Sequence, residues 1–468
     1  MSSLALYNYK NARDVITFLL ASILFGLFLS LVPDVLNGQT PSLTLFQIID
    51  GVPLAFSLEP LGLIFALIAS SLWAVNTLYS VSYLRANNEK NQSRFFAFVG
   101  ASIFGAVGVA TADNLLTFFF FYELLTLSTY PLVNHHGTEY SRKGANTYLA
   151  YLLATSISFL LLGILLTWSY IGSLDFRSGG LLTISSEAPV GLLLFLFMFG
   201  IGKAALMPFH KWLPSAMVAP TPVSALLHAV AVVKAGVFGI LKVIIYVFGI
   251  ETLQAAPLTS WLTLIAAFTI ITASIFALRV DNLKQRLAYS TVSQLSYIVL
   301  CGALFLPSSM VAGAFHIAVH AFSKITLFFA VGAIYTATHR LNASDLAGLG
   351  RRMPVTMVIF GVGALSIIGL PPMAGFFSKW NIVYAAIEGQ SWISLATILV
   401  STLLNTTYFI PVLYIAFFKE EKTEFAKQTS GEAPKLMLFA MILSASATVA
   451  LGLNPGIFWA LATALGGQ

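Results

Sequence analysis

Residues 190–214 read VGLLLFLFMFGIGKAALMPFHKWLP, and this stretch decides the class of fold. Its first part is a solid apolar run, whereas a transmembrane β-strand would alternate apolar and polar residues. Similar runs recur along all 468 residues, of which 58% are hydrophobic and only 9% are charged. Soluble domains carry roughly 25% charged residues, so the composition excludes a water-soluble globular protein. We expect an all-α polytopic membrane protein.

Thirteen largely apolar stretches are long enough to cross a bilayer. They lie at about residues 15–32, 61–83, 95–112, 114–133, 147–170, 188–207, 222–249, 258–278, 286–305, 308–337, 354–386, 391–418 and 434–463. Between the first two spans, residues 42–58 predict a short β-hairpin around Asp50 and Gly51.

The basic residues sort to one side of this arrangement. Loops on that side carry 18 of the 24 Lys and Arg residues, whereas Arg177 alone lies in a loop on the other side. This bias predicts a multi-pass protein of the cell membrane with a cytoplasmic N-terminus and an external C-terminus. It also explains the net charge of +6 without any nucleic-acid partner.

Charged side chains inside the spans need a reason, because one at the centre of a membrane helix costs roughly 2.5–3.5 kcal/mol or more. Glu123 is the one acid in the middle of a span. Lys242 is near enough to a span end to extend its amine to the outer interface. The candidate site residues are Glu123, Lys203, His228, Lys234, His316, His320, Lys324 and Lys379.

The spacing of these candidates predicts a path for protons. His316, His320 and Lys324 follow at i, i+4 and i+8, which places them on one stripe of a helix. His228 and Lys234 are six residues apart, within about 9 Å along a helix axis. Alternatives remain for single residues, since His316 could be a packing histidine and Lys379 an anchor. Glu123 and Lys203 could form a purely structural ion pair.

Two spans are interrupted by proline close to a lysine. Pro208 follows Lys203, and the segment GLPPMAGFFSKW at 369–380 places two prolines before Lys379. Broken membrane helices are tolerated where they line a polar cavity. The two spans are five apart in order, so equivalent helices run in opposite directions, as in inverted repeats. The predicted units are 1–113 with N-terminal helices and hairpin, 114–250 and 258–418 as repeats, and 419–468 with a cytoplasmic loop and last helix.

The sequence predicts no cofactor. Cys301 is the single cysteine, which excludes internal disulfides and Cys-based zinc or iron–sulfur sites, and nucleotide-binding glycine motifs are absent. We therefore expect neither a redox nor a hydrolytic site in this chain, although it could serve as the pump subunit of a larger enzyme.

Several motifs resemble the proton-translocating antiporter-like family. They include FFFFYELLTLSTYPLVNHHGTE at 118–139 and FHIAVHAFSKITLFFAVGAIY at 315–335. This family contains subunits of Mrp-type cation/proton antiporters, of respiratory complex I and of membrane-bound hydrogenases. The resemblance covers roughly residues 60–418 and implies about fourteen helices with two inverted five-helix repeats. The family's usual first helix is missing, so residues 3–9 are expected to be its remnant or the result of a late start codon.

The resemblance also implies roles for the candidate residues. Glu123 would pair with Lys203, and Lys379 would be the terminal charged residue of the second broken helix. His228, Lys234, His320 and Lys324 would form the central relay. A lysine at 379, together with an end after the thirteenth span and no long lateral helix, favours the D-type large component of Mrp antiporters.

The expected function is that of a proton-translocating membrane subunit in a multisubunit Na⁺/proton antiporter. Its expected partners are other membrane subunits and the lipid bilayer. Sodium would bind a partner subunit, because the spans offer one carboxylate among several lysines, which repel cations. Two alternatives stay open: a proton-pumping subunit of a complex I-like oxidoreductase or membrane-bound hydrogenase, and a non-transporting membrane scaffold.

Overall fold

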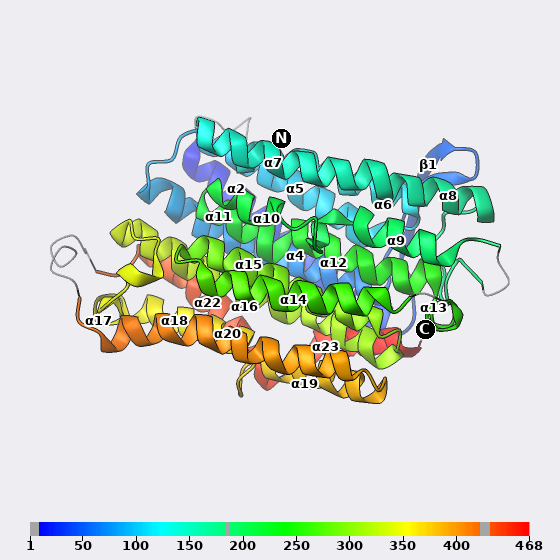
Figure 1. Ribbon diagram of the computed structural model, residues 1–468. Helices are drawn as coiled ribbons and strands as arrows, with labels where there is room; N and C mark the ends of the chain where they lie inside the picture. The colour runs from blue at the N-terminus through cyan, green and yellow to red at the C-terminus, as the bar shows by residue number, and fades with distance from the viewer. Residues whose placement is uncertain (1–8, 184–186, 258, 422–430, 468) are drawn as a thin grey trace.

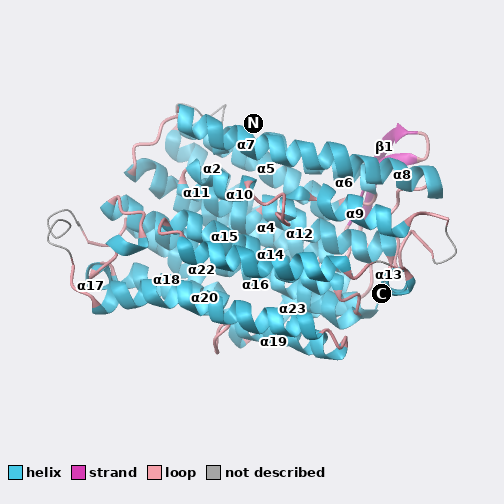
Figure 2. Cartoon of the chain, viewed as in Figure 1, coloured by secondary structure: helices cyan, strands magenta, loops and turns pink. Residues whose placement is uncertain are grey.

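The computed structural model describes residues 9–183, 187–257, 259–421 and 431–467. Long helices lie side by side along one common direction and form a single bundle (Figures 1 and 2). The one sheet among the described residues is a two-stranded hairpin at one end of this bundle. The prediction of an all-α polytopic fold is confirmed.

The first half of the chain contains the hairpin, the first broken span and the helices on either side of that span. Its elements are α2 (Lys10–Ser30), α3 (Val32–Leu36), β1 (Ser42–Ile49), β2 (Val52–Ser57), α4 (Pro60–Ala86), α5 (Gln92–Thr111), α6 (Leu115–Val133), α7 (Glu139–Thr155), η1 (Ser156–Leu161), α8 (Leu162–Ile171), α9 (Val190–Gly200), η2 (Gly202–Ala204), α10 (Trp212–Ser215), η3 (Ala216–Val218), α11 (Thr221–Ala225), η4 (Leu226–Val230), α12 (Val232–Val243) and η5 (Ile244–Phe248).

The second half continues the bundle with fewer interruptions. Its elements are α13 (Ile250–Ala255), α14 (Trp261–Arg279), α15 (Leu283–Ala303), α16 (Pro307–Thr338), η6 (Ala343–Asp345), α17 (Leu349–Arg352), α18 (Pro354–Ile368), α19 (Ala374–Glu388), α20 (Trp392–Phe418), α22 (Lys435–Leu453), α23 (Gly456–Ala464) and η7 (Leu465–Gly467).

Each of the thirteen predicted spans contains an observed helix or a series of helices that follow one another. Among the described residues, 10 helices are long and apolar enough to cross a membrane. Two shorter apolar helices, α9 and α18, are the first halves of the spans that proline was expected to break. The N-terminal residues 3–8, a suggested remnant of another helix, lie outside the described part of the chain.

The hairpin was predicted correctly. Strands β1 and β2 pair antiparallel, with Ile49 opposite Val52 across the turn at Asp50 and Gly51. The hairpin lies at the end of the bundle that also carries α13 (Figure 1). The bundle's opposite end carries α17 (Figure 1), which contains Arg351 and Arg352. The basic loops meet at this end. Arg340 and the α17 residue Arg352 both pair with Glu421. Glu89 pairs with His136, and the two line one cavity with Lys284.

Both predicted interruptions are present. Helix α9 ends at Gly200, and after the short turn η2 the chain runs irregularly to Trp212. Helix α18 ends at Ile368, and α19 begins at Ala374. Glycine lets a neighbour approach the first break closely, because a Cβ on Gly236 would lie 2.3 Å from the carbonyl carbon of Lys203. Helix α12 therefore packs directly against the backbone that carries Lys203.

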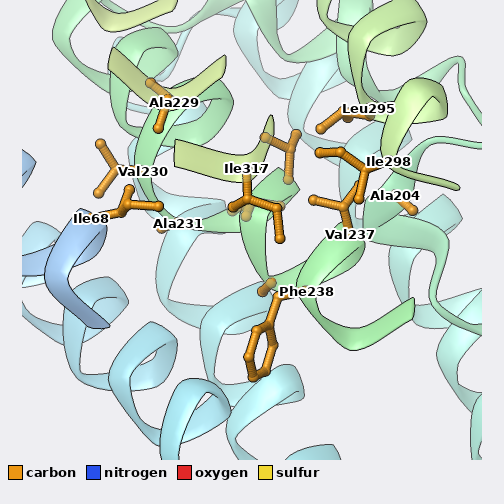
Figure 3. Close-up of a cluster of buried hydrophobic side chains, with 14 of the residues drawn as sticks. Ile68, Ala204, Ala229, Val230, Ala231, Val237, Phe238, Leu295, Ile298 and Ile317 are labelled. Atoms are coloured by element: carbon orange, nitrogen blue, oxygen red, sulfur yellow. The ribbon is translucent and has the colours of Figure 1, made fainter. Parts of the chain in front are cut away.

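An apolar cluster lies in the centre of the bundle and includes Ala204 from the first break. Figure 3 shows side chains from α4, η2, η4, α12, α15 and α16 meeting in the centre of the bundle. Its labelled members are Ile68, Ala204, Ala229, Val230, Ala231, Val237, Phe238, Leu295, Ile298 and Ile317, all fully buried. Burial on this scale keeps water from most of the interior, so a polar side chain here depends on the few partners beside it.

Candidate functional site

Lys203 lies in the first break and is completely buried. Its ammonium donates hydrogen bonds to the Tyr122 carbonyl at 2.8 Å and to the Thr126 hydroxyl at 2.6 Å. The ammonium also lies 3.1 Å from the centre of the Tyr122 ring. A cation over an aromatic face is stabilised in a dry site. Helix α6 thus holds Lys203 through the residue before Glu123 and a residue three positions after it.

Glu123 is close enough for its charge to act on Lys203. Both of its carboxylate oxygens are buried, and neither forms a hydrogen bond with a residue that the structure describes. The direct ion pair that the family resemblance implied is therefore not formed in this structure. A buried carboxylate without a hydrogen-bond partner is costly, so Glu123 depends on the nearby charge of Lys203 for compensation.

The centre of the bundle joins α12 to α16. Lys234 and His320 are both fully buried, and the Lys234 amine hydrogen-bonds the Nδ1 atom of the His320 ring. His316 lies one turn before His320, and their ring centres are 6.3 Å apart. The Nδ1 atom of His316 contacts the Ser378 hydroxyl at 2.7 Å. These contacts link Lys234 to the residue that immediately precedes Lys379.

Lys324 is the third member of the stripe on α16. Its ammonium donates to the Ser290 hydroxyl at 2.6 Å and to the Leu287 carbonyl at 3.3 Å, both on α15. Tyr408 donates to the same Ser290 hydroxyl at 3.2 Å. Lys324 is also close enough to His320 for its charge to act on that ring. The predicted stripe of three residues is therefore one group of interacting side chains.

Lys379 lies just after the second break and is largely buried. Its ammonium donates to the Ile368 carbonyl at the end of α18, at 3.0 Å, and to the Thr402 hydroxyl at 3.3 Å. Interruption of the helix thus leaves a carbonyl free to accept a bond from this lysine. The ammonium also lies 5.2 Å from the ring of Tyr297, on which His316 stacks.

His228 belongs to the π-helical segment η4 and is completely buried. Neither ring nitrogen has a hydrogen-bond partner among the described residues. The ring lies 4.9 Å from that of Phe328, and Lys234, Lys284 and Lys324 are close enough for their charges to act on it. Short π segments occur often at functional sites, and here one brings an unpartnered imidazole among three lysines.

The structure brings seven of the eight candidate residues into two connected groups. The first group is Glu123 with Lys203, and the second consists of His228, Lys234, His316, His320 and Lys324. Lys379 continues the second group through Ser378 and Tyr297. The two groups meet where Gly236, two residues after Lys234, packs on the backbone of Lys203.

The expectation that Lys242 extends to the outer interface is wrong. Its side chain is buried and donates to Glu59 at 2.7 Å and to the Ala112 carbonyl at 2.8 Å. The sequence does not reveal Glu59 as the partner of Lys242, because this acid lies between the predicted hairpin and the next span and reads as a loop charge. The only available signal was its position one residue before Pro60, which begins α4. The pair ties the start of α4 to α12 at the end of the bundle that carries the hairpin.

Replacing Lys242 by methionine should destabilise the protein. The change leaves the Glu59 carboxylate buried without its partner, and breaking a buried pair in this way costs about 3–5 kcal/mol. Adding Glu59→Gln removes the uncompensated charge and should recover most of the loss. Thermal unfolding of the detergent-solubilised protein measures this. A double variant less stable than Lys242→Met alone would contradict the assignment.

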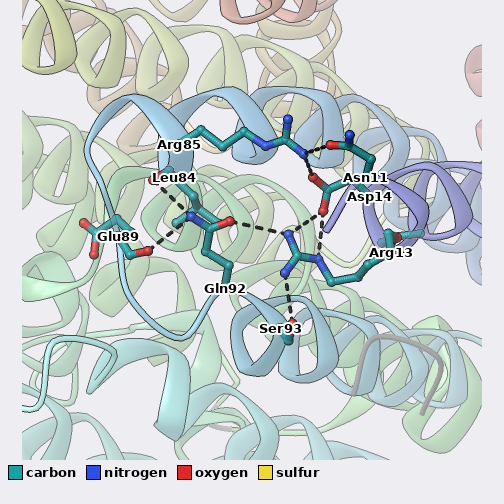
Figure 4. A network of polar contacts seen from close by, with 9 residues as sticks. Asn11, Arg13, Asp14, Leu84, Arg85, Glu89, Gln92 and Ser93 are labelled. Atoms are coloured by element: carbon teal, nitrogen blue, oxygen red, sulfur yellow. Dashed lines mark hydrogen bonds and ion pairs between the residues drawn. The ribbon is translucent and has the colours of Figure 1, made fainter. Parts of the chain in front are cut away.

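A second buried charge cluster lies at the end with the basic loops (Figure 4). Arg13 is buried and donates to Asp14 at 2.6 Å and to Ser93 at 2.9 Å. Asp14 also pairs with Arg85. The cluster ties α2 to α4 and α5. Arg13 therefore stabilises the packing of these helices, in addition to being one of the basic residues on this side of the bundle.

The fold and these contacts define a class: a polytopic membrane protein whose interior holds a row of titratable side chains between two broken helices. Residues 112–405 match the family described as NADH:quinone oxidoreductase/Mrp antiporter, transmembrane. The chain belongs to this family, as an antiporter-like membrane subunit.

Individual relatives agree with this family. The chain is 32% identical over 422 residues to NADH-quinone oxidoreductase subunit N of Desulforudis audaxviator, covering 88% of this chain and 81% of the relative. It is 33% identical over 361 residues to NADH-quinone oxidoreductase subunit L of Rickettsia felis, covering 74% of this chain but 54% of the relative. It thus spans about half the length of several further curated relatives.

A solved structure shows the same fold. A chain in the structure of the Mrp complex from Dietzia sp. superimposes with a TM-score of 0.87 at 20% identity, covering 99% of this chain and 93% of that one.

Proposed function

We propose that this chain translocates protons as a membrane subunit of a multisubunit cation/proton antiporter. The observation that carries the proposal is the connected row from Lys203 to Lys379, which crosses the dry centre of the bundle. Ionisable groups inside a membrane protein are costly and mark ion or proton pathways. A scaffold without transport would have no use for a row of buried lysines and histidines.

The roles within this row follow from the contacts. Glu123 and Lys203 form the proton-binding pair of the first repeat, 114–250. His228, Lys234, His316, His320 and Lys324 carry protons between that repeat and the second, 258–418. Lys379 passes them on at the second break. The chain lies in the cell membrane with its basic loops in the cytoplasm, so that its N-terminus is cytoplasmic and its C-terminus external.

The partners in this proposal are other membrane subunits, as in the Mrp complex that contains the structural neighbour. The lysine at position 379 favours the D-type large component of Mrp antiporters. A second candidate is a proton-pumping subunit of a redox-driven complex, favoured by the match across 81% of an NADH-quinone oxidoreductase subunit N. Purification of the native complex decides between them, since the first predicts small antiporter subunits and the second predicts iron–sulfur or flavin proteins.

The α16 stripe provides one test of the proposed transport. Lys324→Met should lower the rate of proton transport by roughly 100-fold or more, because the relay loses a group that exchanges its proton. His316→Asn should be milder, since the asparagine can still bond to Ser378. Proton uptake by inverted membrane vesicles, compared at equal amounts of complex, measures both. Equal and negligible effects would show that the stripe is structural.

Sodium should not bind this subunit by itself. Its row of buried groups contains one carboxylate, Glu123, among four lysines, and ammonium groups repel a cation. The subunit purified alone should therefore show no saturable ²²Na⁺ binding, while the assembled complex exchanges cations for protons. Saturable sodium binding to the lone subunit that disappears in Glu123→Gln would place the cation site in this chain.

A further inference from the structure

A cavity of about 220 Å³ opens at the end of the bundle that carries the basic loops. Segments far apart in sequence surround it: the ends of α4 and α16, the start of α15, and the loops that follow α6 and η3. Six of its lining side chains are titratable. These are Tyr83, Glu89, His136, Tyr140, Lys284 and Tyr335.

Glu89 and two histidines form a cluster at this cavity. A carboxylate oxygen of Glu89 lies 3.1 Å from the Nε2 atom of His136, and the other lies 3.7 Å from that of His135. Burial raises the pKa of Glu89, but the hydrogen bond and charge of His136, together with the charges of His135 and Lys284, outweigh it and lower the pKa. Burial lowers the pKa of His135, against the attraction of Glu89. These groups can share a proton at the mouth of the cavity.

Lys284 lines the cavity from the first turn of α15. Its side chain is buried, and its ammonium donates to the Ala219 carbonyl at 2.5 Å. The charges of Glu89 and Lys284 act on each other across the cavity. Lys284 precedes the predicted span 286–305 and so reads as a loop charge from the sequence, yet its side chain is buried.

Two helical segments run from the cavity to the central relay. Ser290, which accepts the bond from Lys324, is six residues further along α15, or about 9 Å at 1.5 Å per residue. Thr221 lines the cavity at the start of α11, and His228 follows seven residues later in the same continuous segment. Lys284 and Lys324 both act electrostatically on His228. Lys284 thus lines the cavity and is close enough to the relay for its charge to act on His228.

We propose that this cavity takes up protons from the side of the basic loops, and that Lys284 transfers them from Glu89 and His136 to His228 and Lys324. The proposal rests on the proposed function and adds the place at which protons join the row. The other charged groups at the mouth, Lys90 and Arg94, are exposed or bonded to backbone; Arg94 donates to the His135 carbonyl at 3.0 Å. They set the local potential and take no part in the transfer.

Chemical replacement of the Lys284 amine tests the proposal. In the assembled complex with Cys301→Ser in this chain, Lys284→Cys should lower proton transport by roughly tenfold or more. Treatment with 2-aminoethyl methanethiosulfonate forms a disulfide that carries an aminoethyl group and releases methanesulfinate. The product is a lysine-like side chain, so transport should recover several-fold. Methyl methanethiosulfonate adds no amine and should not restore it. The Cys301→Ser complex without the second change controls for reaction at other subunits.

Labelling reports on the cavity without reference to activity. A membrane-impermeant trimethylammonium methanethiosulfonate should modify Lys284→Cys in inverted vesicles, where the cytoplasmic face is outside, and not in right-side-out vesicles. Mass spectrometry of the chain detects the adduct. Full transport by Lys284→Cys, or labelling only from the external face, would overturn the proposal.

If Lys284→Cys does not assemble, variants of Glu89 and His136 provide a second test of the cavity. Glu89→Gln combined with His136→Gln should slow transport by roughly tenfold. Glu139→Gln and Lys143→Met are matched controls, because that exposed pair lies at the same end of the bundle outside the cavity. Wild-type rates in the Glu89 and His136 variant would overturn the proposal.

A variant of the central row separates this proposal from the proposed function. If Lys203→Met stops transport while the cavity variants leave it unchanged, the function stands and the uptake site is wrong. If Lys203→Met transports protons at the wild-type rate, the proposed function itself fails.

Discussion

Lys203→Met is expected to reduce proton transport by at least roughly 100-fold while the complex still assembles. Methionine is similar to lysine in length and shape, but it has no amine to lie over the Tyr122 ring and cannot bind or release a proton. Glu123 would then lose the nearby positive charge that compensates its buried carboxylate. Proton uptake by inverted vesicles, at matched amounts of complex, measures the loss.

Two companion variants show whether this loss is specific. Glu123→Gln should have a similar effect, because it removes the other proton-binding group of the pair. Lys143→Met removes an exposed lysine whose side chain is 77% accessible, and it should transport normally. Wild-type rates in both Lys203→Met and Glu123→Gln would refute the role of the pair.

Lys234→Met should have an effect as large as that of Lys203→Met, for a different reason. Lys234 is the residue that connects α12 to the histidines of α16, through its hydrogen bond to His320. Without its amine, protons on the first group have no direct route to the second. We expect at least a roughly 100-fold loss of proton transport in reconstituted vesicles.

Non-additivity checks that Lys234 and His320 act together. Residues in direct contact that serve one step should not add their effects. The double variant Lys234→Met and His320→Gln should therefore be no slower than Lys234→Met alone. His339→Asn, at an exposed helix end, is the matched histidine control and should transport normally. Normal transport by Lys234→Met would show that protons cross the bundle elsewhere.

Much of this fold could be predicted because the bilayer imposes few solutions on an apolar chain. Solid hydrophobic runs predicted the thirteen spans, and proline with glycine predicted both broken helices. The turn at Asp50 and Gly51 predicted the hairpin. The π-helical segments, among them the one that carries His228, could not be predicted, since one extra residue per turn leaves no mark in hydropathy.

Candidate residues were easier to find than their partners. A lysine in an apolar run is conspicuous. The free-energy cost of a charge inside a membrane helix is enough to select Lys203, Lys234, Lys324 and Lys379. Their contacts depend on how distant helices pack. The bond of Lys203 to Tyr122 and Thr126, in place of a direct pair with Glu123, arises from the position of the broken segment against α6.

Side chains near the ends of spans were the hardest to interpret. Lys242 and Glu59 are 183 residues apart in sequence, and each reads as an interfacial charge until the helices are assembled. Lys284, two residues before the predicted span 286–305, reads as a loop charge for the same reason. The cavity that it lines draws on several separate parts of the chain, and hydropathy contains no information on such a junction.

The central claim is that this chain itself carries the protons. The most direct test is proton flux into liposomes that contain the assembled complex, driven by an imposed pH gradient and followed with a trapped pH-sensitive dye. Complexes with the wild-type chain are compared with complexes whose chain carries Lys203→Met, Lys234→Met and Lys324→Met together. We predict rapid flux for the wild type and only the leak of protein-free liposomes for the triple variant. Equal flux from the two complexes would contradict the account.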